Sequence, residues 1–122
     1  MYHAIIIEES LKNKEVLKKY KILRTKIGKV WHMSILEIKD PEGAIFDIQQ
    51  AMLESEPYYF HIYDEGEHLI IVFKDKIFRV DPNDRSTWQA PKDYAETVLG
   101  IPPEQLDFYP SQFSYEDEWF YA

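Results

Sequence analysis

Cysteine is absent from the 122 residues, which excludes disulfides, thiolate metal sites and cysteine nucleophiles. Glycine occurs only four times, in neither the G-x-G-x-x-G pattern of dinucleotide sites nor the G-x-x-x-x-G-K-[ST] pattern of phosphate loops. No serine stands in a G-x-S-x-G motif, and the four histidines form no H-x-H or H-x-x-x-H pair. We therefore expect no metal site, no cofactor and none of the standard catalytic motifs.

Long apolar runs are also missing. The chain starts with a short run, Ile5-Ile6-Ile7, which has no basic residue before it and two glutamates after it. This start predicts neither a signal peptide nor a membrane span. With 45% apolar and 30% charged residues, the composition is that of one globular domain. We expect a cytoplasmic protein that does not bind membranes.

Positive and negative charges are separated along the chain, although the net charge is −8. Residues 93–122 contain seven acids and no lysine or arginine. Residues 12–29, here called the basic segment, contain one acid and eight basic residues: Lys12, Lys14, Lys18, Lys19, Lys21, Arg24, Lys26 and Lys29. Lysine is the weaker bidentate phosphate ligand, and an acidic chain repels polyanions. We therefore favour a solvated face and a protected strand edge, or docking of the acidic tail, over binding of nucleic acid.

The chain shows the alternation of short strands and helices that an α+β domain requires. Strands are expected at residues 2–8, 21–27, 30–38, 58–63, 68–73 and 76–80. Helices are expected at residues 11–20, 41–55 and 91–99, the first after Ser10, the second after the Asp40-Pro41 start signal and the third before Gly100. This order predicts a two-layer antiparallel or mixed sheet with helices on one face. A ferredoxin-like βαββαβ core would be followed by extra strands and a C-terminal helix. The alternative is another two-layer α+β sheet centred on residues 58–80.

Residues 58–80, here called the meander, read as three strands joined by two tight turns. A turn centred on Glu65-Gly66 predicts that residues whose numbers add to 131 face each other, so that His61 opposes Ile70. A second turn at Lys74-Asp75 places Arg79 opposite Ile70 on the other side. His61, Ile70 and Arg79 would then form one row across the three strands.

On this register one face of the meander carries groups that suit a small anionic ligand. Imidazole, phenol and guanidinium together supply acid–base, stacking and anion-binding chemistry. The predicted ligand-binding residues are Tyr59, His61, Tyr63, His68 and Arg79. In the alternative, this face is covered by the third helix, the tail or a second subunit, since apolar side chains share it.

Residues 107–122, here called the tail, follow a domain that we place at residues 1–106. Seven of these sixteen residues are aromatic and four are acidic, whereas disordered tails are poor in aromatics. We expect the tail to dock on its own domain, on a second subunit of a dimer or on another protein. The predicted anchors are Trp119, Phe120 and Tyr121, because such side chains dominate interfaces.

These features point to a small binding or interaction domain with a ligand-binding or regulatory role, forming a dimer. One alternative is an enzyme without a recognisable motif, with His61 or His68 as the base and Arg79 binding an anionic group. Another is a nucleic-acid-binding domain that uses the basic segment.

Overall fold

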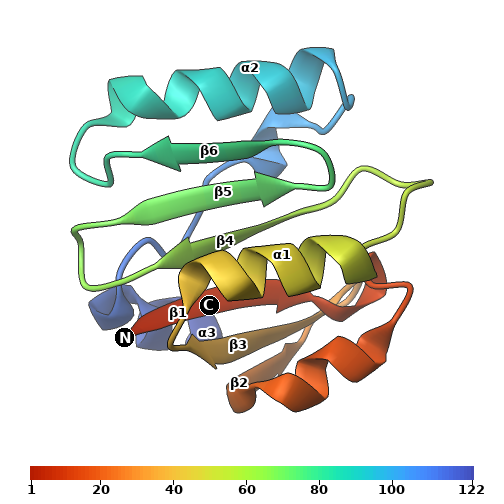
Figure 1. Cartoon of the computed structure of the whole chain (residues 1–122). Helices are drawn as coiled ribbons and strands as arrows, with labels where there is room; N and C mark the ends of the chain where they lie inside the picture. The colour runs from red at the N-terminus through yellow and green to blue at the C-terminus, as the bar shows by residue number, and fades with distance from the viewer.

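The first strand of the chain lies inside the sheet, as its run of β-branched residues predicts. The computed structural model describes all residues, 1–122 (Figure 1). The strands are β1 Tyr2–Ile7, β2 Lys21–Ile27, β3 His32–Ile38, β4 Tyr59–Tyr63, β5 Leu69–Phe73 and β6 Ile77–Val80. They form one open sheet in the order β2-β3-β1-β4-β5-β6, and each neighbouring pair is antiparallel. The prediction of an α+β fold is confirmed.

Helices cover both faces of this sheet, so the prediction of helices on one face is wrong. The α-helices are α1 Pro41–Ala51, α2 Gln89–Thr97 and α3 Glu116–Tyr121. The 3₁₀ helices span Glu8–Ser10, Lys14–Lys19, Arg85–Trp88, Pro103–Gln105 and Phe113–Tyr115. In Figure 1, α1 crosses in front of the sheet, and α3 lies behind it. None of the helices has the length and the apolar character that crossing a membrane would require.

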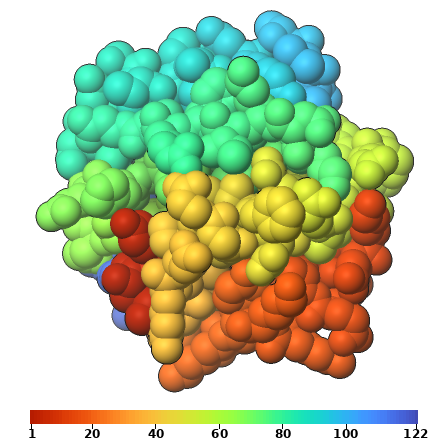
Figure 2. All heavy atoms as spheres, in the orientation of Figure 1, coloured from red at the N-terminus to blue at the C-terminus, as the bar shows by residue number.

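Each face of the sheet has its own hydrophobic core. On the first face, Ala4, Ile6 and Leu36 pack against Ile45 and Ile48 of α1. The space-filling view shows α1 flanked on this face by the N-terminal segment and the meander (Figure 2). On the second face, the sheet packs against residues from the 3₁₀ helix before α2, from α2, from the segment that follows α2 and from the tail: Trp88, Ala95, Ile101, Leu106, Phe108 and Trp119. The sheet therefore has a third layer, built from the C-terminal part of the chain, where the sequence predicted two layers.

The segment between β1 and β2 is not the α-helix that we expected at residues 11–20. Leu11 forms an isolated bridge with Met52, and the helical residues after it are a 3₁₀ helix, Lys14–Lys19. Asn13, not Ser10, caps this helix by accepting a hydrogen bond from the backbone N–H of Glu15 at 3.1 Å. The strand order does not establish a ferredoxin-like core, since this first crossover contains no α-helix and the sheet continues through β5 and β6.

The other two predicted helices begin close to their signals. Helix α1 starts at Pro41 directly after Asp40 and buries Ile45 and Ile48, but it ends at Ala51 rather than near residue 55. Helix α2 is followed by Gly100, whose φ is +69°. The backbone N–H of Ile101 donates to the carbonyl of Ala95 at 3.0 Å, so the chain turns back over the end of the helix at this glycine.

The predicted register of the first meander turn is wrong by one residue. Tyr63 faces Leu69 and His61 faces Ile71, so the loop between β4 and β5 has five residues instead of four. The second turn has the predicted register, with Ile70 opposite Arg79. Because side chains alternate along a strand, the slip places His61 on one face of the sheet and Arg79 on the other.

Candidate functional site

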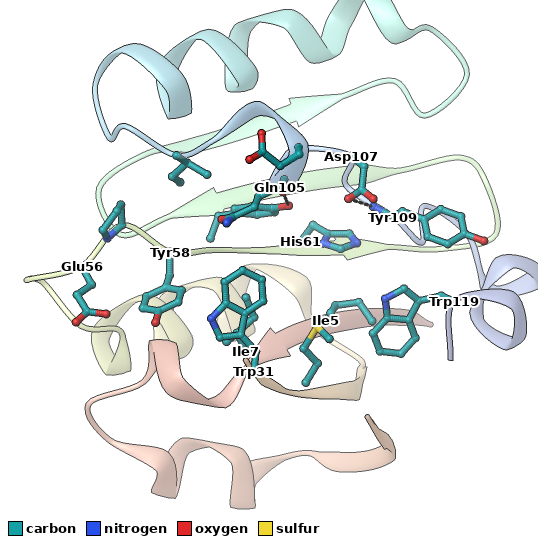
Figure 3. Close-up of a pocket in the computed structure, with 15 residues that line it drawn as sticks. Ile5, Ile7, Trp31, Glu56, Tyr58, His61, Gln105, Asp107, Tyr109 and Trp119 are labelled. Atoms are coloured by element: carbon teal, nitrogen blue, oxygen red, sulfur yellow. Dashed lines mark hydrogen bonds between the residues drawn. The ribbon is translucent and has the colours of Figure 1, made fainter. Parts of the chain in front are cut away.

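A cavity of about 480 Å³ opens on the second face of the sheet, the face that carries the tail (Figure 3). Its floor consists of side chains from three neighbouring strands: Ile5 and Ile7 from β1, Met33 from β3, and Tyr59 and His61 from β4. These residues share a face because each lies at an alternate position of its strand. The walls come from loops and from the tail: Trp31, Glu56, Pro57, Tyr58, Ile101, Glu104, Gln105, Asp107, Tyr109 and Trp119.

His61 is the buried polar residue of this cavity. His61 is only 4% exposed, and its Nε2 lies 2.8 Å from the carbonyl oxygen of Pro110. A carbonyl oxygen only accepts, so Nε2 carries the proton and Nδ1 is left as an acceptor without a protein partner. Burial lowers the pKa of His61 to about 4, although the Pro110 carbonyl and the charge of Asp107 oppose this effect. At neutral pH the ring is therefore uncharged.

Tyr59 lies beside His61 and fixes the segment that follows α2. Its hydroxyl donates to the carbonyl oxygen of Gln105 at 2.5 Å, and its ring meets the buried ring of Phe108 edge-on at 5.5 Å. Burial, with a contribution from the negative charge of Asp107, raises the pKa of Tyr59. The residue acts as a neutral hydrogen-bond donor that is already satisfied.

The charged side chains around the cavity are all acidic. Glu56, Glu104 and Asp107 line it, and no lysine or arginine does. Asp107 is near enough to influence the pKa values of both His61 and Tyr59. The cavity therefore presents an apolar, aromatic interior with a negative rim.

The structure separates the five predicted ligand-binding residues. Tyr59 and His61 line the cavity, and Tyr63 follows them on the same face with its ring stacked near His61 at 5.5 Å. The Tyr63 hydroxyl is occupied, because it donates to Glu116 Oε2 at 2.5 Å. Arg79 pairs with Glu42 on the face covered by α1, and His68 lies in the β4–β5 loop. The predicted row of His61, Ile70 and Arg79 therefore does not exist.

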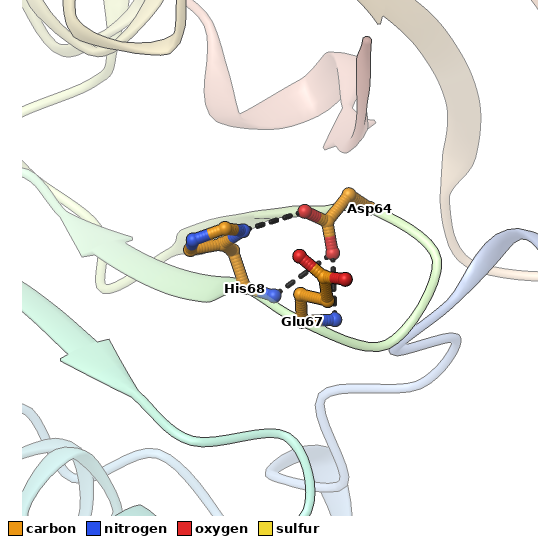
Figure 4. A group of neighbouring side chains, drawn as sticks. All are labelled: Asp64, Glu67 and His68. Atoms are coloured by element: carbon orange, nitrogen blue, oxygen red, sulfur yellow. Dashed lines mark hydrogen bonds and ion pairs between the residues drawn. The ribbon is translucent and has the colours of Figure 1, made fainter.

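His68 belongs instead to a small cluster with Asp64 and Glu67, whose ligand-type atoms lie within 4.8 Å of one another (Figure 4). Asp64 Oδ1 accepts the backbone N–H groups of Glu67 and His68 at 2.9 and 2.8 Å, and Oδ2 lies 2.6 Å from His68 Nδ1. The hydrogen bond to Asp64 raises the pKa of His68. Both carboxylate oxygens of Asp64 have partners already, so this aspartate closes the loop.

The tail is held against the domain by polar contacts as well as by its aromatic side chains. Glu116 Oε2 lies 2.6 Å from His3 Nδ1, and Arg24 donates to Asp117 at 2.5 Å. Lys26 Nζ donates to the carbonyl oxygen of Trp119 at 2.7 Å. Two members of the basic segment thus bind the acidic tail within one chain.

The three predicted anchors of the tail have different environments. Trp119 is 8% exposed and forms part of the cavity wall, whereas Tyr121 is 77% exposed. Phe120 lies beneath the guanidinium of Arg24, with 4.8 Å between the guanidinium carbon and the ring centre. Trp119 is therefore buried without any second subunit.

Several residues of the cavity were not among the ligand-binding residues predicted from the sequence. Trp31 lies in the β2–β3 hairpin loop, and Asp107 and Tyr109 lie in the first part of the tail. An aromatic residue in a hairpin loop, such as Trp31, and a tyrosine–histidine pair, such as Tyr59 and His61, are weak signals when taken separately. They line one cavity only because β1 pairs with β3 on one side and with β4 on the other.

Comparisons with protein-family models, with curated proteins and with solved structures find no match to this chain. What the protein does must therefore be inferred from the cavity itself.

Proposed function

We propose that the protein is a binding module that holds a small, largely apolar organic molecule in the cavity on the second face of the sheet. The observation that carries this proposal is the cavity's lining: five aromatic rings and several aliphatic side chains around one buried imidazole. Pockets of a few hundred Å³ with an apolar lining and few polar groups are typical of small-molecule sites. The volume of about 480 Å³ is within that range.

Binding is a better proposal than catalysis because of the state of His61. A histidine whose pKa is about 4 is a weak base at neutral pH, and its Nε2–H is engaged by the Pro110 carbonyl. Arg79, the anion-binding member of the predicted catalytic set, lies on the opposite face of the sheet. The cavity offers apolar surface, one hydrogen-bond acceptor on His61 and the carboxylates of its rim.

Binding of nucleic acid through the basic segment receives less support from the contacts. Lys12 pairs with Glu54, Lys18 with Glu15 and Lys19 with Asp47. Arg24 and Lys26 contact the tail. More than half of the eight basic side chains thus already have a partner of the same chain.

The neutral fluorescent probe N-phenyl-1-naphthylamine tests the proposal. We expect a saturable increase in its emission with a stoichiometry of one probe per chain. The variant Ile7→Trp fills the cavity from its floor and should abolish this signal. The matched variant Phe46→Trp, on the exposed side of α1 at 64% exposure, should leave it unchanged. Absence of saturable emission, or equal emission from the two variants, would overturn the proposal.

A further inference from the structure

We infer that the cavity selects an organic cation: a protonated amine carried on an apolar or aromatic body. This inference rests on the proposed binding function and specifies the class of ligand. It replaces the anionic ligand that the sequence predicted, because the arginine on which that prediction depended lies on the other face of the sheet.

The first reason is the charge of the cavity. Glu56, Glu104 and Asp107 contribute three carboxylates, and no basic side chain lines the cavity to neutralise them. Lys26 contacts the wall residue Trp119: its Nζ donates to the carbonyl oxygen of Trp119 and lies 5.1 Å from the centre of that indole ring, whereas no cation lies over the ring of Trp31. An ammonium group is attracted by this arrangement and a carboxylate or phosphate is repelled.

The second reason is that three hydrogen-bond donors of the cavity lining, on Tyr59, His61 and Tyr109, are already used by backbone carbonyl groups. The Tyr59 hydroxyl donates to Gln105 at 2.5 Å, and His61 Nε2–H donates to Pro110 at 2.8 Å. The Tyr109 hydroxyl donates to the carbonyl oxygen of Tyr115 at 3.4 Å. The polar groups that remain include four acceptors, His61 Nδ1 and the three carboxylates, and the carboxylates are the charged groups among them. An ammonium group has only donors, so it complements this set.

The third reason is the aromatic character of the walls. Figure 3 shows the indole rings of Trp31 and Trp119 with Ile5 between them and with His61 facing the same space. Tryptophan and tyrosine faces attract cations, tryptophan most strongly, and the attraction grows where water is excluded. The same rings pack against the apolar body of the ligand.

Three probes that share one body and differ in charge test the inference: 4-phenylbutylamine, 4-phenylbutanol and 4-phenylbutyrate, each displacing N-phenyl-1-naphthylamine at pH 7. We expect the amine to bind about fivefold to tenfold more tightly than the alcohol, and the carboxylate to bind most weakly. Raising the sodium chloride concentration should weaken the binding of the amine and leave the binding of the alcohol unchanged.

A charge-neutral variant locates the effect. Asp107→Asn should lower the affinity for the amine about fivefold, because it removes a negative charge. The affinity for the alcohol should not change, because the amide retains the size of the side chain. The matched variant Asp75→Asn, in the exposed β5–β6 turn outside the cavity, should alter neither. If the alcohol binds as tightly as the amine, or if the carboxylate binds best, the cation inference fails and the binding function stands. If none of the three probes displaces the dye from a site that Ile7→Trp blocks, the cation inference also fails and the binding function stands. If Ile7→Trp does not block the binding of the dye, the proposed function fails as well.

Discussion

Glu116 attaches the tail to the domain, and the variant Glu116→Ala tests how much this attachment stabilises the protein. One oxygen of its carboxylate, Oε2, receives the Tyr63 hydroxyl at 2.5 Å and lies 2.6 Å from His3 Nδ1. Tyr63 is fully buried, and the side chains of His3 and Glu116 are 15% and 14% exposed. Hydrogen bonds to charged groups contribute about 1.5–3 kcal/mol each, so the loss of both, with a buried hydroxyl left unpaired, should cost about 3 kcal/mol.

The assay is urea unfolding followed by far-ultraviolet circular dichroism at pH 7. The matched control is Glu118→Ala in the same helix α3, because that glutamate is exposed and should change the free energy of unfolding by no more than about 0.5 kcal/mol. Tyr63→Phe removes the hydroxyl that Glu116→Ala would leave unpaired, so the double variant should cost less than the sum of the two single ones. A cost for Glu116→Ala no larger than that for Glu118→Ala would refute the proposed attachment.

Three further outcomes follow from the structure. Burial lowers the pKa of His61 to about 4, so the unfolded chain takes up a proton first as the pH falls. The free energy of unfolding should therefore drop by about 3 kcal/mol between about pH 6.5 and 4, and urea midpoints of His61→Phe should lack this part of the pH dependence. Trp119→Ala removes a buried wall of the cavity and should cost about 3 kcal/mol in urea unfolding while weakening dye binding severalfold. Gly100→Ala meets no atom within 4 Å, yet at φ +69° it should cost about 1 kcal/mol in the same assay, from backbone strain alone.

Much of the secondary structure could be predicted because its signals are local. Asp40-Pro41 starts α1, Gly100 terminates α2, and the Ile5-Ile6-Ile7 run marks a strand buried on both faces. The segment at residues 11–20 could not be predicted in the same way. Its bridge between Leu11 and Met52 is a tertiary contact, and it overrides the helical spacing of the apolar residues.

The ligand-binding residues were predicted incorrectly because the β4–β5 loop is one residue longer than the sequence indicated. The carboxylate of Asp64, the first of the five loop residues, accepts the backbone N–H groups of Glu67 and His68 and so holds the five-residue loop. The tight four-residue turn that Glu65-Gly66 indicates would have kept His61 and Arg79 on one face. A chain-local pattern does not reveal such side-chain capping of a loop, and a slip of one residue exchanges the two faces.

The cavity itself depends on pairings between distant segments. Its floor needs β4 beside β1, and its walls need the tail to return across the sheet. The composition of the tail indicated that it would dock somewhere, since its aromatic content is too high for a solvated end. The composition could not indicate which face would receive it.

The central place of β1 has a consequence for how quickly the protein folds. The hairpin β2–β3 and the meander β4–β5–β6 are each built from neighbouring strands, whereas β1 pairs with β3 and β4, which come later in the chain. The sheet thus consists of two locally formed halves joined by a strand that precedes both of them in the sequence. Joining them requires closure of long loops, which slows folding relative to proteins rich in local contacts. Folding rate should therefore respond to substitutions in β1 more than to those in the β5–β6 turn.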